Sequence, residues 1–367
     1  MLRRIVMDRE LDAMGMLDLM VSPGFFVKDQ KIVKCNAGAL SLFLREGMEI
    51  LPLLAAGEAE YLEFSGGCLY LMLDISGVRM GASVTALGDG HVFLLDTESE
   101  QAELQAMALA ARELREPLAG IMTAAERLFP LTAMEENAAL REQASRLNRG
   151  LYQMLRIIGN MSDAGSCAAI PAARMETVNI TAFFQDLFQR AEGLMTHSNL
   201  TLHFENLSCS LYMLADTEKL ERAVMNILSN AMKFTPAGGC ISAILCRRGN
   251  RLQLTVRDSG EGIPESIRGS IHRRYRRQPG IEDNRFGIGL GMVLIRSAAA
   301  IHGGAVLIDH PEDAGTRITL TMAIRQNTSG TLRSPLLRLD YAGERDHALL
   351  ELSEILPPSL YDPTDIL

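Results

Sequence analysis

Apolar residues recur at alternating steps of three and four between residues 104 and 128, and this repeat constrains the fold of the 367-residue chain more than any other feature. Its members are Leu104, Met107, Ala111, Leu114, Leu118, Ile121, Ala125 and Leu128. A second series has the same spacing and comprises Leu140, Ala144, Leu147, Leu151, Met154, Ile158 and Met161. This spacing is typical of the apolar seam of a coiled coil or a helical bundle. Two helices separated by a turn at Pro130 cannot bury both seams alone, so the sequence predicts a symmetric dimer that forms a four-helix bundle.

Composition limits the function classes. A net charge of -9 argues against general nucleic-acid binding, which requires many Lys and Arg residues to neutralise phosphates. Six cysteines occur without a CxxC pair, so neither a zinc site nor a disulfide framework is predicted; they are Cys35, Cys68, Cys167, Cys209, Cys240 and Cys246. No run of eighteen apolar residues occurs, and the first thirty residues lack the pattern of an apolar signal-peptide region followed by a cleavage site. We therefore expect a cytoplasmic protein with reduced thiols and no membrane span.

The first part of the chain has the pattern of a compact α+β domain. Glycine-containing turns separate short β-type runs, which are Gly24–Val27, Lys31–Val33, Cys68–Leu73 and His91–Leu95. A short helical stretch falls between Ala37 and Arg45, with Asn36 at its start. This order of elements resembles a PAS sensory domain. The alternative interpretation is a small α/β dimerisation module.

The region from about residue 170 to residue 326 contains the first of three polar motifs, NILSNAMKFTPAGG (226–239). Asn226 and Asn230 are one helical turn apart on one face, and Lys233 follows. An amide oxygen is a suitable ligand for Mg²⁺, which prefers oxygen and keeps several waters. Taken alone, however, two asparagines on a helix are more often ordinary surface residues.

The other two motifs combine a carboxylate with glycines. In RDSGEGIP (257–264), Asp258 ends a strand-like run and is followed by Gly260 and Gly262. A carboxylate there can accept the exocyclic amine of a purine, while glycines allow the backbone to approach the ring. In FGIGLGM (286–292), three glycines precede an apolar helical run: Gly287, Gly289 and Gly291. Glycines that lead into a helix N-terminus provide backbone N–H groups for phosphates.

In this order and spacing, the three motifs resemble the N, G1 and G2 boxes of the ATP-binding domain of two-component sensor histidine kinases. This is the GHKL or HATPase fold of Bergerat type, which gyrase and MutL share. The resemblance extends to Asp216, Leu220, the HGG at 302–304 and the AGTRITLTM at 314–322. It implies an α/β sandwich that binds ATP and Mg²⁺. A Rossmann or P-loop interpretation fails, because neither glycine motif has the required form.

The same resemblance implies a role for each motif residue. Asn230 would coordinate Mg²⁺, Asn226 would support that coordination, and Lys233 would reach a phosphate. Asp258 would read the adenine, beside Gly260 and Gly262, and the three G2 glycines would face the triphosphate. Residues 267–286 correspond to the mobile nucleotide lid and contain six arginines in an acidic chain. Of these, Arg274 and Arg277 match the family's phosphate contacts, whereas His272 replaces the Phe that usually docks the lid.

The helical repeat contains RELREP (112–117), which is in register with the family's phosphoacceptor motif but has Arg112 where the histidine would stand. A guanidinium remains protonated and has no lone pair for phosphoryl transfer, so it cannot act as the acceptor. None of the seven histidines lies in the repeat; they are His91, His197, His203, His272, His302, His310 and His347. Glu116 occupies the place of a Thr or Asn that would orient water. Glu113 corresponds to the family's helper base, although an ordinary helix carboxylate is the alternative.

These patterns together predict a multidomain α+β protein with four parts: a PAS-like domain (1–97), a dimerisation hairpin (98–165), an ATP-binding domain (170–326) and a tail with one helix (327–367). The tail would pack on the ATP-binding domain or dock a partner. One function hypothesis is an ATP-dependent regulatory module or pseudokinase that binds a response regulator or another kinase. The alternative is an active sensor kinase in a phosphorelay, which uses an unusual acceptor or phosphorylates a partner subunit. A gyrase-like ATPase is disfavoured because the helical hairpin precedes the ATP-binding domain and no transducer domain follows.

Overall fold

The computed structural model describes residues 15, 17–130, 137–166, 174–263, 289–311, 314–326 and 346–363. The elements of the N-terminal part and the hairpin are β1 (Gly24–Lys28), β2 (Lys31–Cys35), α2 (Ala37–Ser41), η1 (Leu51–Leu53), β3 (Leu54–Ala56), α3 (Glu58–Leu62), β4 (Cys68–Ile75), β5 (Val78–Leu87), β6 (Gly90–Leu95), α4 (Glu98–Leu128) and α6 (Ala138–Ser166). The later elements are β7 (Glu176–Asn179), α7 (Ile180–Met195), η2 (Thr196–Ser198), β8 (Thr201–Asn206), β9 (Tyr212–Ala215), α8 (Thr217–Phe234), β10 (Cys240–Arg248), β11 (Arg251–Asp258), α10 (Gly291–Ile301), β12 (Val306–Asp309), β13 (Arg317–Ala323), α11 (His347–Glu351) and η3 (Pro358–Tyr361).

The N-terminal strands form an antiparallel sheet in the order β2-β1-β6-β5-β4, and β3 pairs with β4. All four β-type runs read from the sequence correspond to strands of this sheet. The helical stretch is shorter than expected, because Phe43 has a positive φ of 64° and α2 ends before it. Asn36 caps α2 by accepting from the Ala39 N–H, and its amide donates to the Ser22 carbonyl. One side chain thus holds the start of the helix against the preceding chain.

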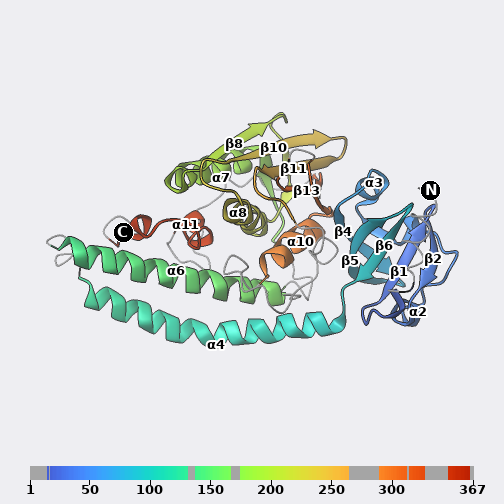
Figure 1. Ribbon diagram of the computed structural model, residues 1–367, viewed down its shortest axis with the longest axis horizontal. Coiled ribbons are helices and arrows are strands. Elements are labelled where there is room, and N and C mark those ends of the chain that lie inside the picture. The colour runs from blue at the N-terminus through green and yellow to red at the C-terminus, as the bar shows by residue number, and fades with distance from the viewer. Residues whose placement is uncertain are drawn as a thin grey trace.

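The N-terminal sheet continues directly into the sheet of the C-terminal part. Strand β4 pairs antiparallel with β12, with Tyr70 opposite Val306 and Cys68 opposite Ile308. The result is one eleven-stranded sheet in which β12-β13-β11-β10-β8 extends the N-terminal order. Figure 1 shows the N-terminal strands at one end of the molecule, beside α10 and β13. Backbone hydrogen bonds therefore connect the two parts in addition to the chain that links them.

Helices α4 and α6 form a long antiparallel hairpin (Figure 1). Thr97 caps α4 in a capping box, since its side chain accepts from the Glu100 N–H and Glu100 accepts from the Thr97 N–H. The predicted seam divides into two stripes: Leu104, Ala111 and Leu118 are buried, whereas the side chains at the alternate positions Leu114, Ile121 and Leu128 are exposed. In α6, Ala144, Leu151 and Ile158 are buried, and Leu147 and Met154 are exposed. Among the described residues, no helix is long and apolar enough to cross a bilayer.

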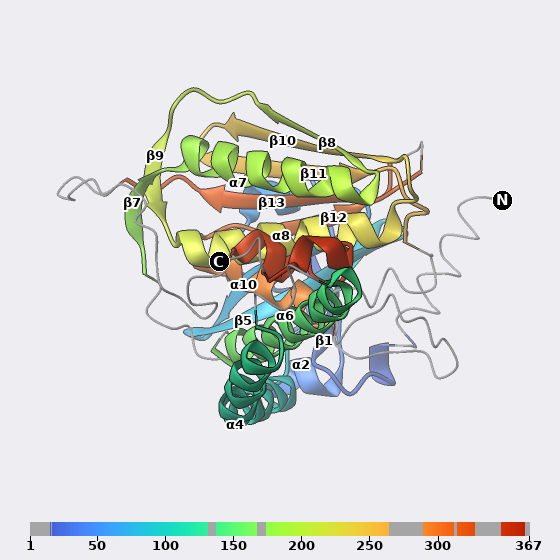
Figure 2. The ribbon, with the colours of Figure 1, turned by 90° about the vertical axis from the view of Figure 1, so that its left-hand side faces the viewer.

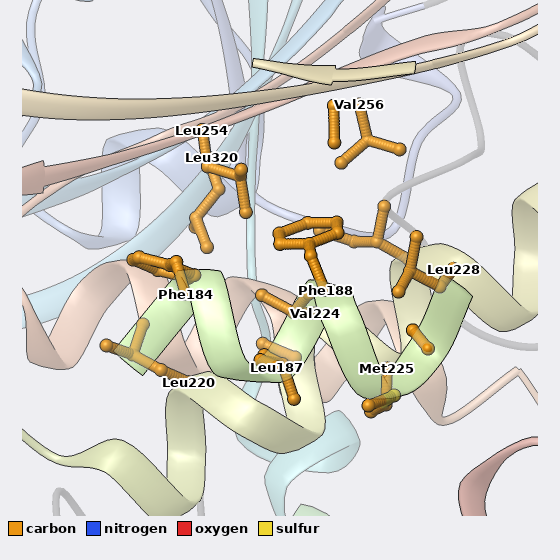
Figure 3. Packing of buried hydrophobic residues seen from close by; sticks show 14 of the residues in the cluster. Phe184, Leu187, Phe188, Leu220, Val224, Met225, Leu228, Leu254, Val256 and Leu320 are labelled. Carbon is orange, nitrogen blue, oxygen red and sulfur yellow. The ribbon is translucent and has the colours of Figure 1, made fainter. Parts of the chain in front are cut away.

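In the C-terminal part, α7 and α8 pack on one face of the sheet (Figure 2). Figure 3 shows Phe184, Leu187 and Phe188 of α7 and four residues of α8 below the strands. The strand residues facing them in this view are Leu254, Val256 and Leu320. All these side chains are buried in one cluster, which is the main core of the chain. This core fixes α8, the helix that contains the first polar motif.

The described end of the tail, residues 346–363, packs between α6 and α8 and joins the same core. Its apolar residues in the core are Ala348, Leu350, Leu352, Leu356 and Tyr361. Helix α11 ends at Glu351, although helical spacing continues further in the sequence. Pro357 and Pro358 lack N–H groups, so a longer helix would leave the carbonyls of Ser353 and Glu354 without helical donors. The Arg149 guanidinium donates to both carbonyls instead, at 3.0 and 2.9 Å.

Candidate functional site

Asp216 is the N-cap of helix α8, and its side chain accepts from the Lys219 N–H at 3.1 Å. The Asp216 N–H donates to Nε2 of the buried His302, and Nδ1 of His302 lies 2.7 Å from the Ala298 carbonyl. Both ring nitrogens are therefore engaged, and His302 must be neutral for Nε2 to accept. Burial lowers the pKa of His302 below its ordinary value of 6.5 and favours this state. The HGG turn after α10 thus holds the start of α8.

Asn226 and Asn230 occupy one face of α8, one turn apart, as the sequence predicts. Asn226 is buried and donates to the Arg222 carbonyl at 2.8 Å. Gly291 begins α10 against this side chain, since a β-carbon at Gly291 would lie 2.8 Å from the Asn226 Oδ1. Within the described residues, the side chain of the N-cap residue Leu290 makes no capping hydrogen bond to α10. The first N–H groups of such a helix are suitable donors for an anion. Asn230 is half-buried. The first and third motifs are therefore brought together.

The second motif contacts the end of the same helix. The Asp258 carboxylate is buried, and its Oδ1 accepts from the N–H groups of Gly260 at 2.9 Å and Thr316 at 3.1 Å. Burial raises the pKa of Asp258, although these hydrogen bonds oppose the shift. A β-carbon at Gly260 would collide with the Phe234 carbonyl at the end of α8. Gly262 has a positive φ of 75° and lies against His310, whose Nε2 accepts from the Ile263 N–H at 2.8 Å.

Lys233 lies at the end of the same face, but its side chain pairs with the tail. Its Nζ is 2.5 Å from the Glu354 Oε2. Arg156 of α6 also binds Glu354, with 2.6 Å between Nη1 and Oε2. Burial opposes ionisation of Glu354, but Lys233 and Arg156 outweigh it and hold the pKa of Glu354 below its ordinary value. Burial lowers the pKa of Lys233, with Glu354 opposing the shift. At 2.5 Å, the contact between Lys233 and Glu354 has the geometry of an ion pair.

A second tail carboxylate lies deeper in the same network. Glu351 is 1% exposed and is 3.3 Å from both the Arg156 Nε and the Arg222 Nε. Arg222 of α8 also pairs with Asp163 of α6 and donates to the Asn160 amide oxygen at 2.6 Å. Arg156 in turn donates to the Ser229 hydroxyl at 3.0 Å. The hairpin, α8 and the tail are thus joined by one buried network of charges.

The residues predicted around the missing acceptor lie on the outer hairpin helix. Arg112, Glu113 and Glu116 are all exposed on α4. The hairpin helix that contacts α11 and contributes Arg156 to the network is α6, not α4 (Figure 1). Helix α4 reaches the candidate site near its own N-terminal end, where Leu104 is buried with Leu290 and Val293 at the start of α10. Arg112 follows eight residues later, on an exposed part of α4.

Several predicted site residues lie outside the described part of the chain. They are Arg274, Arg277 and Gly287, together with His272 and the other lid arginines. Gly289 is described and has a positive φ of 77°. Sequence reasoning did not identify Arg156, Arg222, Glu351 or Glu354 as neighbours of the site. Glu351 and Glu354 are two carboxylates three residues apart in a short apolar segment, which could have indicated a buried charged contact. The sequence does not indicate which basic residues they pair with.

Parts of this chain are similar to proteins described as histidine kinases. Residues 215–326 match a family model described as "Histidine kinase-, DNA gyrase B-, and HSP90-like ATPase". The chain is 27% identical over 231 residues to the "Adaptive-response sensory kinase SasA" of Rippkaea orientalis, covering 59% of this chain and 57% of that protein. It is 28% identical over 240 residues to the "Histidine protein kinase DivJ" of Caulobacter vibrioides, covering 61% and 40%.

A third relative is much longer. The "Hybrid signal transduction histidine kinase D" of Dictyostelium discoideum is 28% identical over 248 residues, which cover 63% of this chain and 15% of that protein. The chain therefore matches less than two thirds of the length of each of these three relatives. Among solved structures, full-length ShkA in complex with AMPPNP matches 61% of this chain and 46% of that chain, at 20% identity and a TM-score of 0.48.

Proposed function

We propose that this chain, a member of the two-component histidine kinase family with a histidine kinase-type ATPase domain, is an ATP-dependent signalling module that does not phosphorylate itself at the usual position. ATP would bind between α8, the Asp258 loop and the N-terminus of α10. The output would be a change in how the protein binds a response regulator or another kinase.

The observation that carries this proposal is the convergence of three distant motifs on one helix. Asn226 lies against Gly291, and Gly260 lies against the Phe234 carbonyl at the other end of the same face. A nucleotide on this face could place its purine at Asp258 and its phosphates at the start of α10. The buried carboxylate supplies an acceptor for an exocyclic amine, and the uncapped helix supplies N–H donors for phosphate oxygens.

The residues present fit a magnesium ion that arrives with the nucleotide. Among the described residues, no group of three or more His, Cys, Asp or Glu side chains could hold a metal. Mg²⁺ commonly takes one or two protein ligands and fills its other positions with water and phosphate oxygens. We assign the protein ligand to the amide oxygen of half-buried Asn230, with Asn226 supporting α10 beside it.

The absence of an acceptor supports a regulatory rather than a self-phosphorylating role. Arg112 has no lone pair to attack a phosphorus atom, and Glu116 replaces the residue that would orient water. Glu113, the proposed helper base, is exposed beside Arg112 and has no acceptor histidine next to it in the sequence to activate. We infer that nucleotide occupancy changes the conformation of the hairpin without a phosphorylated intermediate at position 112.

The exposed apolar stripes support a homodimer. Leu114, Ile121 and Leu128 are 46, 49 and 73% exposed and lie seven residues apart on α4. A groove of about 320 Å³ opens between α4 and α6, and its lining includes Met122, Leu155 and Ile158. A second hairpin could cover these apolar groups and complete a four-helix bundle. Residues 1–97 would form the PAS-like sensory domain, which the strand order β2-β1-β6-β5-β4 and the short helices between these strands support.

A nucleotide-binding titration beside a labelling assay tests the proposal. The purified chain would be titrated with Mg-ATP and incubated with ATP labelled at the γ position. We expect saturable binding and no label in the protein. Binding should be lost in Asn230→Ala but retained in Asn250→Ala, a matched change in the exposed β10–β11 turn. Entry of label would instead support an active kinase with a substitute acceptor, and mapping of the labelled residue would identify it.

A further inference from the structure

We propose that the tail residue Glu354 competes with the nucleotide for Lys233. The Glu354 carboxylate pairs with the Lys233 ammonium group, which a phosphate group of ATP would otherwise contact. This inference rests on the proposed nucleotide site. It adds an inhibitory function to the C-terminal tail, which no motif of the ATP-binding domain predicts.

The geometry places an anion where an anionic ligand is expected. The Glu354 Oε2 is 2.5 Å from the Lys233 Nζ and 2.6 Å from the Arg156 Nη1. A carboxylate and a phosphate oxygen make the same kind of charge-assisted hydrogen bond with an ammonium group. Lys233 follows Asn226 and Asn230 on α8. Its side chain is long and flexible, and an ammonium group that is drawn to the Glu354 carboxylate is less available to a phosphate on the Asn230 side.

The tail is anchored firmly enough to keep Glu354 in place. Leu350, Leu352 and Leu356 are fully buried in the main core on both sides of this residue. The Arg149 guanidinium holds the carbonyl of Glu354 itself at 2.9 Å. The carboxylate is therefore presented at a fixed place, as it would be by a bound peptide, but without the entropy loss of association.

The Glu354 side chain can nevertheless leave Lys233 without undocking the tail. Its side chain is 33% exposed, whereas Glu351 is 1% exposed and remains bound to Arg156 and Arg222. Rotation of one side chain would free Lys233, and Arg156 could retain the displaced carboxylate. Competition thus involves exchange of one anion for another at Lys233, while the buried pairs continue to hold the ATP-binding domain on α6.

Glu354→Gln in the full chain tests this directly, because the amide keeps the size of the side chain and removes its charge. We expect the dissociation constant of Mg-ATP to fall about tenfold, the scale of one charge-assisted hydrogen bond. The affinity for adenosine, which has no phosphate, should not change. Asp362→Asn is the matched control, since this tail carboxylate pairs with Arg141 at 3.4 Å instead of Lys233. Thermal unfolding would verify that each variant is folded.

A double variant separates competition from a general loosening of the tail. If Lys233 is the contested group, Glu354→Gln should give no gain of Mg-ATP affinity in a Lys233→Met background. Equal Mg-ATP affinities of the wild type and Glu354→Gln, with binding lost in Asn230→Ala, would overturn the inhibitory role and leave the nucleotide site intact. An equal gain for adenosine and ATP would also overturn it. Absence of Mg-ATP binding in both proteins would refute the nucleotide site itself.

Discussion

The guanidinium carbon of Arg296 lies 4.6 Å from the centroid of the Tyr70 ring, so the helix that begins at the candidate phosphate site contacts a strand of the N-terminal sheet. The Tyr70 hydroxyl donates to the Asp96 carboxylate at 2.7 Å, and Arg296 approaches the other carboxylate oxygen at 3.5 Å. Asp96 immediately precedes Thr97, the cap of α4. Three side chains therefore connect the N-terminal part, the hairpin and α10.

Arg296→Met should loosen this junction. The substitution keeps much of the side-chain volume but removes a largely buried cation from an aromatic face and a carboxylate, and we expect a loss of about 1–2 kcal/mol. Chemical denaturation measures the loss, and faster amide exchange in β4 and β12 would locate it. Arg146→Gln is the control, because that pair with Glu142 is exposed on α6 and should contribute about 1 kcal/mol or less. Equal effects of the two changes would contradict a special role of Arg296.

Stability should decrease as the pH falls below about 6.5. Burial lowers the pKa values of both His302 and His91 below the ordinary value of 6.5, so the unfolded chain binds more protons than the folded chain in this range. The stabilisation that comes from keeping these two histidines neutral is fully present above pH 6.5. It is lost progressively as the pH falls from 6.5 toward the lowered pKa values of the folded chain. Denaturant midpoints between pH 5.5 and 7.5 would show the slope. His302→Gln should reduce it, whereas His203→Gln, an exposed change on β8, should not.

Glu351→Gln should destabilise the protein by about 3–5 kcal/mol, because it removes the carboxylate that faces two buried guanidinium groups. Arg156 and Arg222 are only 8 and 3% exposed, so water cannot replace the lost charge readily. Glu142→Gln is the matched control, since its pair with Arg146 is exposed on α6. Urea denaturation compares the variants. A loss below 1 kcal/mol for Glu351→Gln would contradict the structural importance of the network.

Two Gly-to-Ala changes should act in opposite directions. At Gly260 the added methyl group would collide with the Phe234 carbonyl, and we expect a loss of about 1–3 kcal/mol together with weaker Mg-ATP binding. Gly193 is exposed within α7 and has open space at the β-carbon position, so Gly193→Ala should stabilise by about 0.5–1 kcal/mol. Thermal unfolding and nucleotide titration would test both. A stable Gly260→Ala variant with unchanged binding would remove the argument for close packing of this loop.

Ile121→Asp should convert the proposed dimer into a monomer, because it places a charge in the middle of the exposed stripe. Leu109→Asp is the matched control on the same helix: Leu109 is also exposed but lies outside the three-and-four repeat. Sedimentation analysis would give the mass of each variant. Dissociation by both changes, or by neither, would contradict a dimer built on the stripe that contains Leu114, Ile121 and Leu128.

The sequence was sufficient for the hairpin and for the juxtaposition of the three motifs. The apolar repeat predicts both helices of the hairpin, because local periodicity is enough to identify a helix. The resemblance of the three motifs to one nucleotide site predicts that Asn226 and Gly291, 65 positions apart, lie close together. Strand β5 was not predicted: its run contains Gly81, which lies below the Tyr70 hydroxyl and interrupts the apolar alternation. A side chain at position 81 would collide with Tyr70 on the neighbouring strand β4, and this reason for the glycine is visible only in the folded sheet.

Long-range pairing was the part that the sequence could not supply. Glu354 is 198 residues from Arg156 and 121 from Lys233, and charged residues elsewhere in the chain were equally plausible partners for it. Lys233 was predicted to reach a phosphate, and the structure pairs it with the tail; its role toward a nucleotide stays a prediction. The assignments of Arg274, Arg277 and Gly287 also stay predictions, since these residues lie outside the described part of the chain.

The pairing of β4 with β12 has a practical consequence for work with fragments. Separating the chain near Thr97 would not release two finished units, because each fragment would carry a newly unpaired strand edge with apolar residues such as Leu69 or Val306. Unpaired edges of this kind recruit other strands and promote aggregation. Precipitation of a truncated ATP-binding fragment would therefore be explained by the loss of β4 beside β12. It would not show that the sequence of the fragment is unable to fold.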